Sequence, residues 1–382
     1  MESAESWFSP EEVERARAYH RPLYRAWATS TVIGLGYLAV LSFTAAGDRL
    51  ASPLDGLPLW PRGLLYPALV LGLGALLRLP ISYWRGYVHE HRWGFSTQRI
   101  LGWFGDWAKA VGLSVAITSL ALLVLVELAA RLPDSWQWFA AAGAALLVVV
   151  LSLLGPVVFE PLFNRFHPLD DAALAEEVRE LGRAAGAPVD RVLVADASRR
   201  TKKENAYVSG IGRTRRVVVY DTLLARGEPQ EVKLVVAHEL CHRRARHTAK
   251  GTALGALGAA LAVALLAAAL GSAWVLQAIH AGSPADPLIA PFALLLFGAL
   301  ELVSLPVGAA VSRRWERVAD RASVELTGDG DGFARMTRNL AISNLSELDP
   351  TRLAYLLFTH PSPPERIAAA LAGDAGPGGS QR

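Results

Sequence analysis

Five consecutive residues, His238-Glu239-Leu240-Cys241-His242, have the types and spacing of a metal-binding helix. Residues four apart share one face of a helix, so His238 and His242 can bind the same ion. Glu239 lies about 60° around the helix from His242, close enough to reach a water on that ion. This HExxH arrangement predicts a zinc centre with two histidine ligands and Glu239 as the general base of a peptidase.

A catalytic zinc ion takes a third protein ligand. The metzincin pattern has its third histidine one residue beyond the position of His247, so we interpret His247 as exposed or facing lipid headgroups. Glu316 is the better candidate, because a glutamate from a second helix completes a His-His-Glu set. Asp320 shares its helix face and can accept a hydrogen bond from a ligand histidine. From spacing alone, a solvated helix with Arg–Glu pairs is an equally good interpretation.

Glu301 and Glu325 are rival carboxylates for the third position. Glu301 falls within an apolar run, where a charge costs about 2.5–3.5 kcal/mol. Glu301 must therefore face protein or water, either in a polar chamber or in a hydrogen-bonded core. Cys241 points away from Glu239 on a helix, so we expect it to pack against the protein rather than bind metal.

The composition predicts a membrane protein, because 52% of the 382 residues are hydrophobic and only 19% are charged. Several apolar runs reach the roughly 20 residues that a helix needs to cross a bilayer. The fold class that we predict is mainly α: a polytopic membrane protein with about six transmembrane helices and a cytosol-facing, zincin-like α+β catalytic part. The expected spans are 26–46, 63–83, 110–130, 138–158, 251–279 and 288–311.

The distribution of Lys and Arg predicts the orientation of the spans. Residues 159–250 carry 17 basic residues, whereas the connection between the fifth and sixth runs carries none. Alternation of rich and poor segments places both ends and the HExxH helix on the cytoplasmic side. The single cysteine agrees with a reducing compartment. An excess of Arg over Lys is typical of GC-rich bacterial genes, so we expect a bacterial plasma membrane.

The chain divides into five segments along its length. They are an N-terminal region with four transmembrane helices (1–158), a soluble insert with the HExxH helix (159–250), two further transmembrane helices (251–311), C-terminal catalytic helices with the third ligand (312–373) and a disordered tail (374–382).

The soluble insert is predicted to combine helices with short strands. We expect a helix at 172–187, strands at 192–195, 205–209 and 217–220, and a turn at 210–212. The metal-binding helix should run from Pro229 to about Ala249. Further helices are expected at 331–346, 351–358 and 363–372. The basic clusters 199–203 and 213–216 are expected to face anionic headgroups, and no nucleic-acid binding is predicted.

The chain resembles the CAAX prenyl proteases of the zinc-metallopeptidase type from about residue 8 to residue 371. Many stretches resemble the family pattern and occur in the same order along the chain, and this resemblance favours Glu316 as the third ligand. They comprise Glu90 with 94–98, Asp106, Lys109, 159–166, 205–208 with Gly210 and Gly212, 221–224, the HExxH, 312–320, 344–346, and 359–361 with Glu365 and Arg366.

The resemblance implies a membrane-embedded endopeptidase whose spans enclose a water-filled chamber, with one zinc ion per chain at the cytoplasmic side. It implies that Asn205 lies on an edge strand that pairs with the substrate backbone, and that His360 stabilises the oxyanion. The partners would be the lipid bilayer and a peptide or membrane-protein substrate, with or without a prenyl group. Two features depart from the family: Cys241 replaces a usual glycine, and six spans are counted where eukaryotic members have seven.

Two alternatives remain open at this point. A membrane quality-control metalloprotease of the heat-shock type would be shorter, with two spans before the metal helix, and the four here favour the CAAX type. A non-proteolytic scaffold or lipid-handling protein could keep a structural zinc ion. Glu239 argues against this second alternative, because a structural site needs no base beside its ligands.

Overall fold

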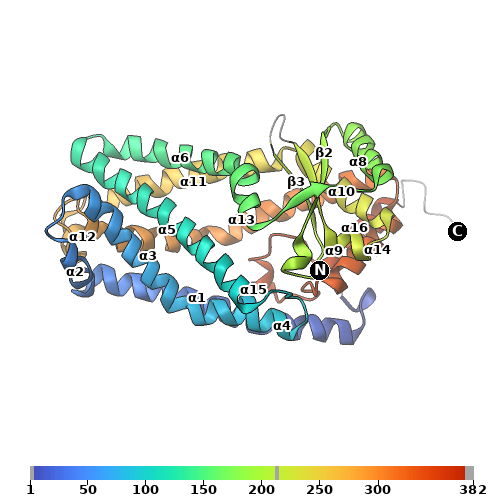
Figure 1. The fold of residues 1–382 in the computed structure, drawn as a ribbon, viewed down its shortest axis with the longest axis horizontal. Helices are drawn as coiled ribbons and strands as arrows, with labels where there is room; N and C mark the ends of the chain where they lie inside the picture. Colours follow the sequence, from blue (N-terminus) through green and yellow to red (C-terminus); the bar gives the residue numbers. More distant parts are fainter. Residues whose placement is uncertain (1–3, 211–214, 375–382) are drawn as a thin grey trace.

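A computed structural model describes residues 4–210 and 215–374 of the chain. The predicted tail from residue 375 onward, and residues 211 and 212 of the predicted turn, lie outside the described residues. Long helices run side by side along the longest axis of the molecule, and a small sheet with short helices lies at one end (Figure 1). The long helices are α1 (Pro10–Phe43), α3 (Leu59–Tyr83), α5 (Ile100–Arg131), α6 (Trp136–Leu154), α11 (His247–Leu270) and α13 (Ala290–Thr327).

These helices contain the six apolar runs expected from the sequence, and in the described residues six helices are long and apolar enough to cross a membrane. Two of the spans extend through π-helical turns at their sheet end, Trp84–His89 and Gly155–Phe159. The fifth span is shorter than predicted. Helix α11 ends at Leu270, where Gly271 and Ser272 interrupt it before the short helix α12 (Ala273–Ala278).

An apolar cluster holds the bundle together at the end remote from the sheet. It joins the end of α1, the start of α3, the end of α5 and the start of α13, through residues such as Leu41, Tyr66, Val126 and Ile289. Elsewhere the spans keep most of their surface free, since at most 22% of any apolar window is buried. Exposed apolar side chains on helices of this length suit a lipid environment.

The soluble part contains a four-stranded sheet in the order β1-β2-β4-β3. Strands β2 (Arg191–Ala195) and β4 (Arg216–Tyr220) are parallel, and β3 (Ala206–Ser209) is antiparallel to β4 at the edge. The sequence predicted these three strands but not β1 (Phe166–Pro168), which pairs antiparallel with β2. Three residues that include His167 and Pro168 show no strand-like alternation, so pattern alone could not find β1.

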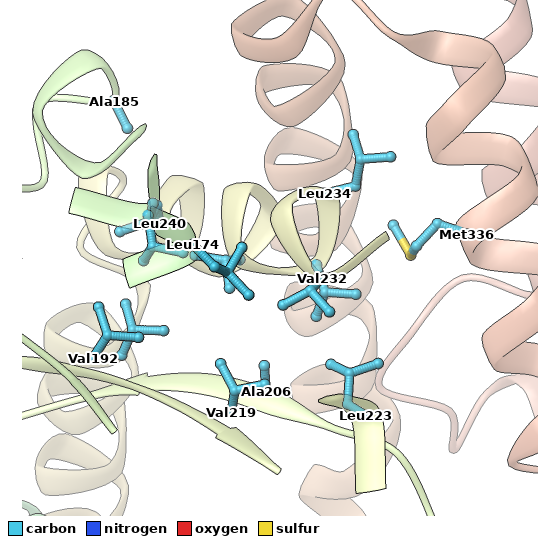
Figure 2. Packing of buried hydrophobic residues seen from close by; sticks show 14 of the residues in the cluster. Leu174, Ala185, Val192, Ala206, Val219, Leu223, Val232, Leu234, Leu240 and Met336 are labelled. Carbon is cyan, nitrogen blue, oxygen red and sulfur yellow. The ribbon is translucent and has the colours of Figure 1, made fainter. Parts of the chain in front are cut away.

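The sheet and the surrounding helices enclose a separate apolar core (Figure 2). Helix α10 (Pro229–Arg244) packs on it through Val232, Val236 and Leu240, which recur every four residues and therefore share one face. His238 and His242 consequently lie on the opposite face. The remaining helices of this part are α7 (Glu160–Phe163), α8 (Ala172–Ala184), α9 (Asp221–Arg226), α14 (Gly330–Ser343), α15 (Arg352–Tyr355) and α16 (Pro363–Asp374).

Helix α10 is shorter than expected from the sequence. It ends at Arg244 rather than near Ala249, because Arg246 adopts a left-handed conformation (φ 55°) that stops the helix. Helix α11 begins immediately afterwards at His247. The chain thus turns sharply between the metal-binding helix and the fifth span.

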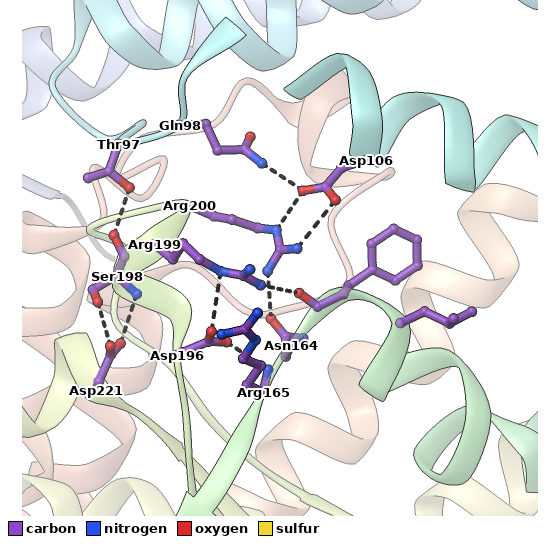
Figure 3. Close-up of polar contacts among 12 residues, drawn as sticks. Thr97, Gln98, Asp106, Asn164, Arg165, Asp196, Ser198, Arg199, Arg200 and Asp221 are labelled. Atoms are coloured by element: carbon purple, nitrogen blue, oxygen red, sulfur yellow. Dashed lines mark hydrogen bonds and ion pairs between the residues drawn. The ribbon is translucent and has the colours of Figure 1, made fainter. Parts of the chain in front are cut away.

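Ion pairs fasten the segment between β2 and β3 to the ends of the membrane helices, and Figure 3 shows the pair of Arg200 with Asp106. Arg200 Nε lies 2.7 Å from Asp106 Oδ2 of α5, and Lys203 Nζ lies 3.1 Å from Glu90 Oε2. These two members of the 199–203 cluster, expected to face lipid headgroups, are instead paired within the protein. Their carboxylate partners lie about a hundred residues earlier in the chain, so the sequence pattern gave no sign of the pairing.

Candidate metal centre

His238 and His242 project from α10 with their Nε2 atoms 3.1 Å apart. Both rings are largely withdrawn from solvent. Burial lowers the pKa of His238, but contacts with Asp320 and Glu316 more than offset this effect and raise it to about 9. The two carboxylates thus favour positive charge at this imidazole.

Glu316 of α13 reaches the same point from the other side. Its Oε1 lies 3.3 Å from His242 Nε2, and its Oε2 lies 3.4 Å from His238 Nε2. Oε2 is buried and accepts no hydrogen bond among the described residues. The structure thus brings together the three residues that the sequence proposed as ligands, although Glu316 comes 74 positions after His242 in the chain.

The three ligand atoms fit a zinc ion. Two nitrogen or oxygen ligands at about 2.0–2.1 Å from a tetrahedral zinc ion are about 3.3 Å from each other. The two Nε2 atoms are 3.1 Å apart, and the two oxygens of Glu316 lie 3.3 and 3.4 Å from one ring nitrogen each, so every contact is close to that edge; one ligand atom from each residue lies within 4.8 Å of the other two. Without a cation, the facing lone pairs of the two Nε2 atoms and the buried carboxylate oxygen without a donor would destabilise the folded protein. A cation between the three side chains resolves both features.

Asp320 fixes the ring of His238. Its Oδ1 lies 2.9 Å from His238 Nδ1, the nitrogen that faces away from Glu316. Arg366 of α16 in turn donates to both oxygens of Asp320, at 2.6 and 2.9 Å. A carboxylate behind a ligand histidine orients the ring and raises its basicity.

His247 does the corresponding task for His242, contrary to the sequence interpretation of an exposed or headgroup-facing residue. Its side chain is buried, with the residue 6% exposed, and it stacks on Trp315 with a ring separation of 5.0 Å. Its Nδ1 lies 2.9 Å from His242 Nδ1. The sharp turn at Arg246 folds His247 back beside the helix that precedes it, and regular helix geometry did not anticipate this contact.

Glu239 lies beside the ligand set with a free carboxylate. It makes no hydrogen bond or ion pair in the described part of the chain, and it lines the cavities on both sides of the metal centre. Burial raises the pKa of Glu239, although the neighbouring histidines oppose the shift. A carboxylate that is both unpaired and more basic than usual can accept a proton.

His360 lies in the loop before α16, and its Nε2 is 3.4 Å from Glu316 Oε1. Its side chain is 61% exposed and lines both cavities. Buried Arg313 supports this loop by donating to the carbonyl oxygens of Tyr355 and Phe358, at 2.9 and 2.5 Å. The ring is thus held within reach of a molecule bound between Glu239 and the ligands.

The free edge of β3 borders the centre. Asn205, directly before the strand, has an exposed side chain and lines a cavity of about 450 Å³ that also contains His238 and Glu239, here called the Asn205 cavity. Asn344 closes the start of this edge. Its amide accepts from the Glu204 N–H at 2.8 Å and donates to the Glu204 carbonyl at 2.9 Å, as a neighbouring strand would.

Two sequence expectations about other residues can be compared with the structure. Cys241 is buried and unpaired, and burial raises its pKa to about 11, in agreement with a packing role. The rival carboxylates lie away from the metal centre: Glu301 lines a cavity of about 290 Å³ within the bundle with Arg78, and Glu325 lines one beside α16.

Comparison with known proteins identifies the family. Residues 168–373, more than half of the chain, match the model of peptidase family M48. The chain belongs to this family. Residues 2–165 of this M48 protein match the model described as CAAX prenyl protease N-terminal, five membrane helices. The described part of that region contains four candidate spans rather than five.

Relatives of this M48 protein occur in bacteria and eukaryotes. The Uncharacterized metalloprotease YhfN of Bacillus subtilis is 32% identical over 298 residues, which cover 77% of this chain and 70% of that protein. CAAX prenyl protease 1 of Saccharomyces cerevisiae is 27% identical over 326 residues, covering 81% and 72%. The crystal structure of S. mikatae Ste24p shares the fold, with a TM-score of 0.80 at 24% identity, over 95% of this chain and 89% of that one.

These findings confirm the predicted family resemblance, fold class and enzyme class. The chain is a multi-pass membrane metalloprotease with a mainly helical architecture. The comparisons favour this function over the heat-shock type and the non-proteolytic scaffold that the sequence left open.

Proposed function

We propose that this chain binds one zinc ion through His238, His242 and Glu316 and uses it to hydrolyse peptide bonds. One observation carries this proposal. One ligand atom from each of His238, His242 and Glu316 lies within 4.8 Å of the other two, and the Glu316 carboxylate that faces both rings has a buried oxygen with no donor among the described residues. Of the metals common in proteins, zinc suits a set of two imidazoles and a carboxylate that leaves a position open.

A bound zinc ion would lower the pKa of water towards about 7 and polarise the scissile carbonyl. The carboxylate of Glu239 takes a proton from the attacking water and later delivers it to the leaving amine. Both of its oxygens are free of hydrogen bonds within the described residues, so they are available for this transfer. Asp320 and His247 keep the rings of His238 and His242 in orientation.

His360 donates a hydrogen bond to the oxygen on which charge develops. Its exposed ring near Glu316 Oε1 occupies the side of the centre where a substrate carbonyl would lie. One preorganised donor of this kind contributes on the order of 10²–10³ in kcat.

The substrate chain adds to the free edge of β3, with Asn205 binding its backbone. This edge has unpaired backbone groups and borders the two cavities that meet at Glu239. Antiparallel addition places the part of the substrate beyond the scissile bond near Asn205 and the part before it near Ser209, because β3 runs from one cavity to the other.

The substrate class that we propose is a peptide or membrane protein presented from the cytoplasmic side of a bacterial plasma membrane. The distribution of basic residues supports that side. Relatives named CAAX prenyl protease 1 make a farnesylated CAAX peptide the first substrate to test.

Metal analysis of the purified protein, paired with cleavage of a farnesylated CAAX peptide and its unlipidated twin, tests this function. We expect one zinc ion per chain, cleavage of at least one peptide, and loss of cleavage when zinc is removed and its return when zinc is restored. Preference for the farnesylated peptide supports a prenyl protease, and equal turnover supports a quality-control protease. A protein that holds no stoichiometric metal and cleaves neither peptide would contradict the proposal.

A further inference from the structure

A second and larger cavity adjoins the metal centre on the side of Ser209. It encloses about 980 Å³ and lies between the sheet end of α6, the turn between α10 and α11, and the end of β3. Its wall includes Glu239, His242 and Glu316, so it is continuous with the metal centre. Arg215, Arg243 and Arg246 also line it, and we call it the arginine cavity.

These three arginines have no carboxylate partner in the described part of the chain. Arg216, the neighbour of Arg215 on β4, shows the contrast: its Nη2 lies 2.8 Å from Glu160 Oε2. Among the described residues, Arg243 donates to the Gly210 carbonyl, at 3.3 Å, and the buried Nε of Arg215 has no acceptor.

The Asn205 cavity differs in its charged residues. Glu204 and Glu347 line it, and the one arginine among its described lining residues, Arg366, is paired with Asp320, whereas the arginine cavity has Arg215, Arg243 and Arg246 beside Glu160, Glu239 and Glu316. Because β3 starts at the Asn205 cavity and ends at the arginine cavity, an antiparallel substrate meets carboxylates after the scissile bond and arginines before it. This polarity rests on the proposed function.

We propose that the arginine cavity is an anion-binding subsite that selects peptides with an acidic side chain on the N-terminal side of the scissile bond. Arg243 directly follows the ligand His242 on α10, Arg246 lies in the turn just after that helix, and substrate residues rise about 3.3 Å each. The selected side chain should therefore lie about two to four residues before the bond. Guanidinium groups suit a carboxylate because they can donate two parallel hydrogen bonds.

Binding to a catalytically disabled protein tests the subsite separately from cleavage. In full-length Glu239→Gln protein loaded with zinc, a fluorescent peptide with Glu three residues before the cleavage position should bind about tenfold or more tightly than its Gln twin, the effect of one charge-assisted hydrogen bond. Arg243→Gln with Arg246→Gln should bring the ratio close to one. The preference survives even if the chain proves not to cleave, so the two proposals fail separately.

Two further variants make the test specific. Arg244→Gln, an exposed neighbour on the same helix that does not line the cavity, should keep the wild-type ratio. Arg246→Glu should favour a peptide with Lys at the tested position over one with Glu. Zinc content measured for each variant shows that the metal centre is intact.

Three results would overturn the inference. One is a Glu-to-Gln ratio of one in the parent protein, and another is a ratio unaffected by the double substitution. The third is that vesicles of anionic phospholipid compete with the peptide in a way that requires Arg243 and Arg246, although the Glu-to-Gln ratio does not require them. The cavity would then be a lipid-headgroup site.

Discussion

Replacing His247 by Phe separates its proposed positioning role from its packing. Phe keeps an aromatic ring on Trp315, which now stacks at 5.0 Å with planes 7° apart. It removes the 2.9 Å contact with His242 Nδ1. His247 is 6% exposed, and it also lines the arginine cavity. We therefore expect a defect in the metal centre with little change in thermal stability.

The size of the effect follows from what His242 loses. A buried donor left without a partner costs about 1–3 kcal/mol. Loss of a group that orients a ligand histidine typically lowers metal affinity ten- to hundredfold, or about 1.4–2.7 kcal/mol. The two figures agree, so zinc affinity in His247→Phe should fall by one to two powers of ten, on the order of these values.

Competition with a fluorescent zinc chelator at neutral pH measures this affinity in detergent-solubilised protein. His280→Asn is the control, because His280 pairs with Asp48 at 2.6 Å at the remote end of the bundle and should not affect zinc. Unchanged zinc affinity in His247→Phe would refute the reasoning and return His247 to a purely packing role.

Three further predictions follow from the site and its borders. Glu239→Gln should keep one zinc ion and lose cleavage by a factor of about 10² or more, because the amide cannot accept the proton; cleavage at the wild-type rate would remove Glu239 from the mechanism. Asn344→Leu should lower kcat/KM about fivefold through KM, since about 1 kcal/mol is lost from hydrogen bonds that hold Glu204 at the start of the substrate edge; Asn339→Leu, on the exposed face of α14, the helix that ends at Asn344, is its control. Burial raises the pKa of Glu204 above that of the unfolded chain, so its contribution to stability is fully present below the unfolded pKa and is lost as pH rises through the folded pKa. Glu204→Gln should therefore raise the melting temperature at pH above neutrality but not under mildly acidic conditions, and a uniform shift at both would contradict the assignment.

Sequence features that depend on near neighbours predicted the structure well. The four-residue spacing of His238 and His242 is enough to place both rings on one helix face, opposite the apolar face that packs on the sheet. Hydropathy likewise located the six spans, because each needs only a continuous apolar run. Helix periodicity and apolar runs depend only on neighbouring residues, so they can be recognised without knowing which distant segments meet.

Contacts between distant segments were harder to predict. Glu316 could be chosen over its rivals only through the family resemblance, because spacing says nothing about which carboxylate folds back to α10. His247 was misinterpreted because a single left-handed residue, Arg246, turns the chain where a continuous helix was expected. Arg200 was assigned to the lipid surface because Asp106, its partner, comes 94 residues earlier.

Helix α13 links the membrane part and the metal centre in one rigid element. It begins in the apolar cluster remote from the sheet and continues for 38 residues to Thr327, carrying Glu316 and Asp320 in its last part. One helix thus fixes the distance between the bilayer and the third ligand. Among the proposed ligands, Glu316 alone comes from this helix, so it is the most direct point at which to test the whole arrangement.

X-ray absorption spectroscopy of the zinc-loaded protein, with zinc content determined before and after substitution of Glu316, is that test. We predict one zinc ion per chain with two imidazole nitrogens and a carboxylate oxygen as protein ligands, and loss of tight binding in Glu316→Gln but not in Glu325→Gln, an exposed carboxylate on the same helix. An unchanged zinc spectrum and stoichiometry in Glu316→Gln would show that α13 does not complete the site, and the proposed metal centre would be wrong.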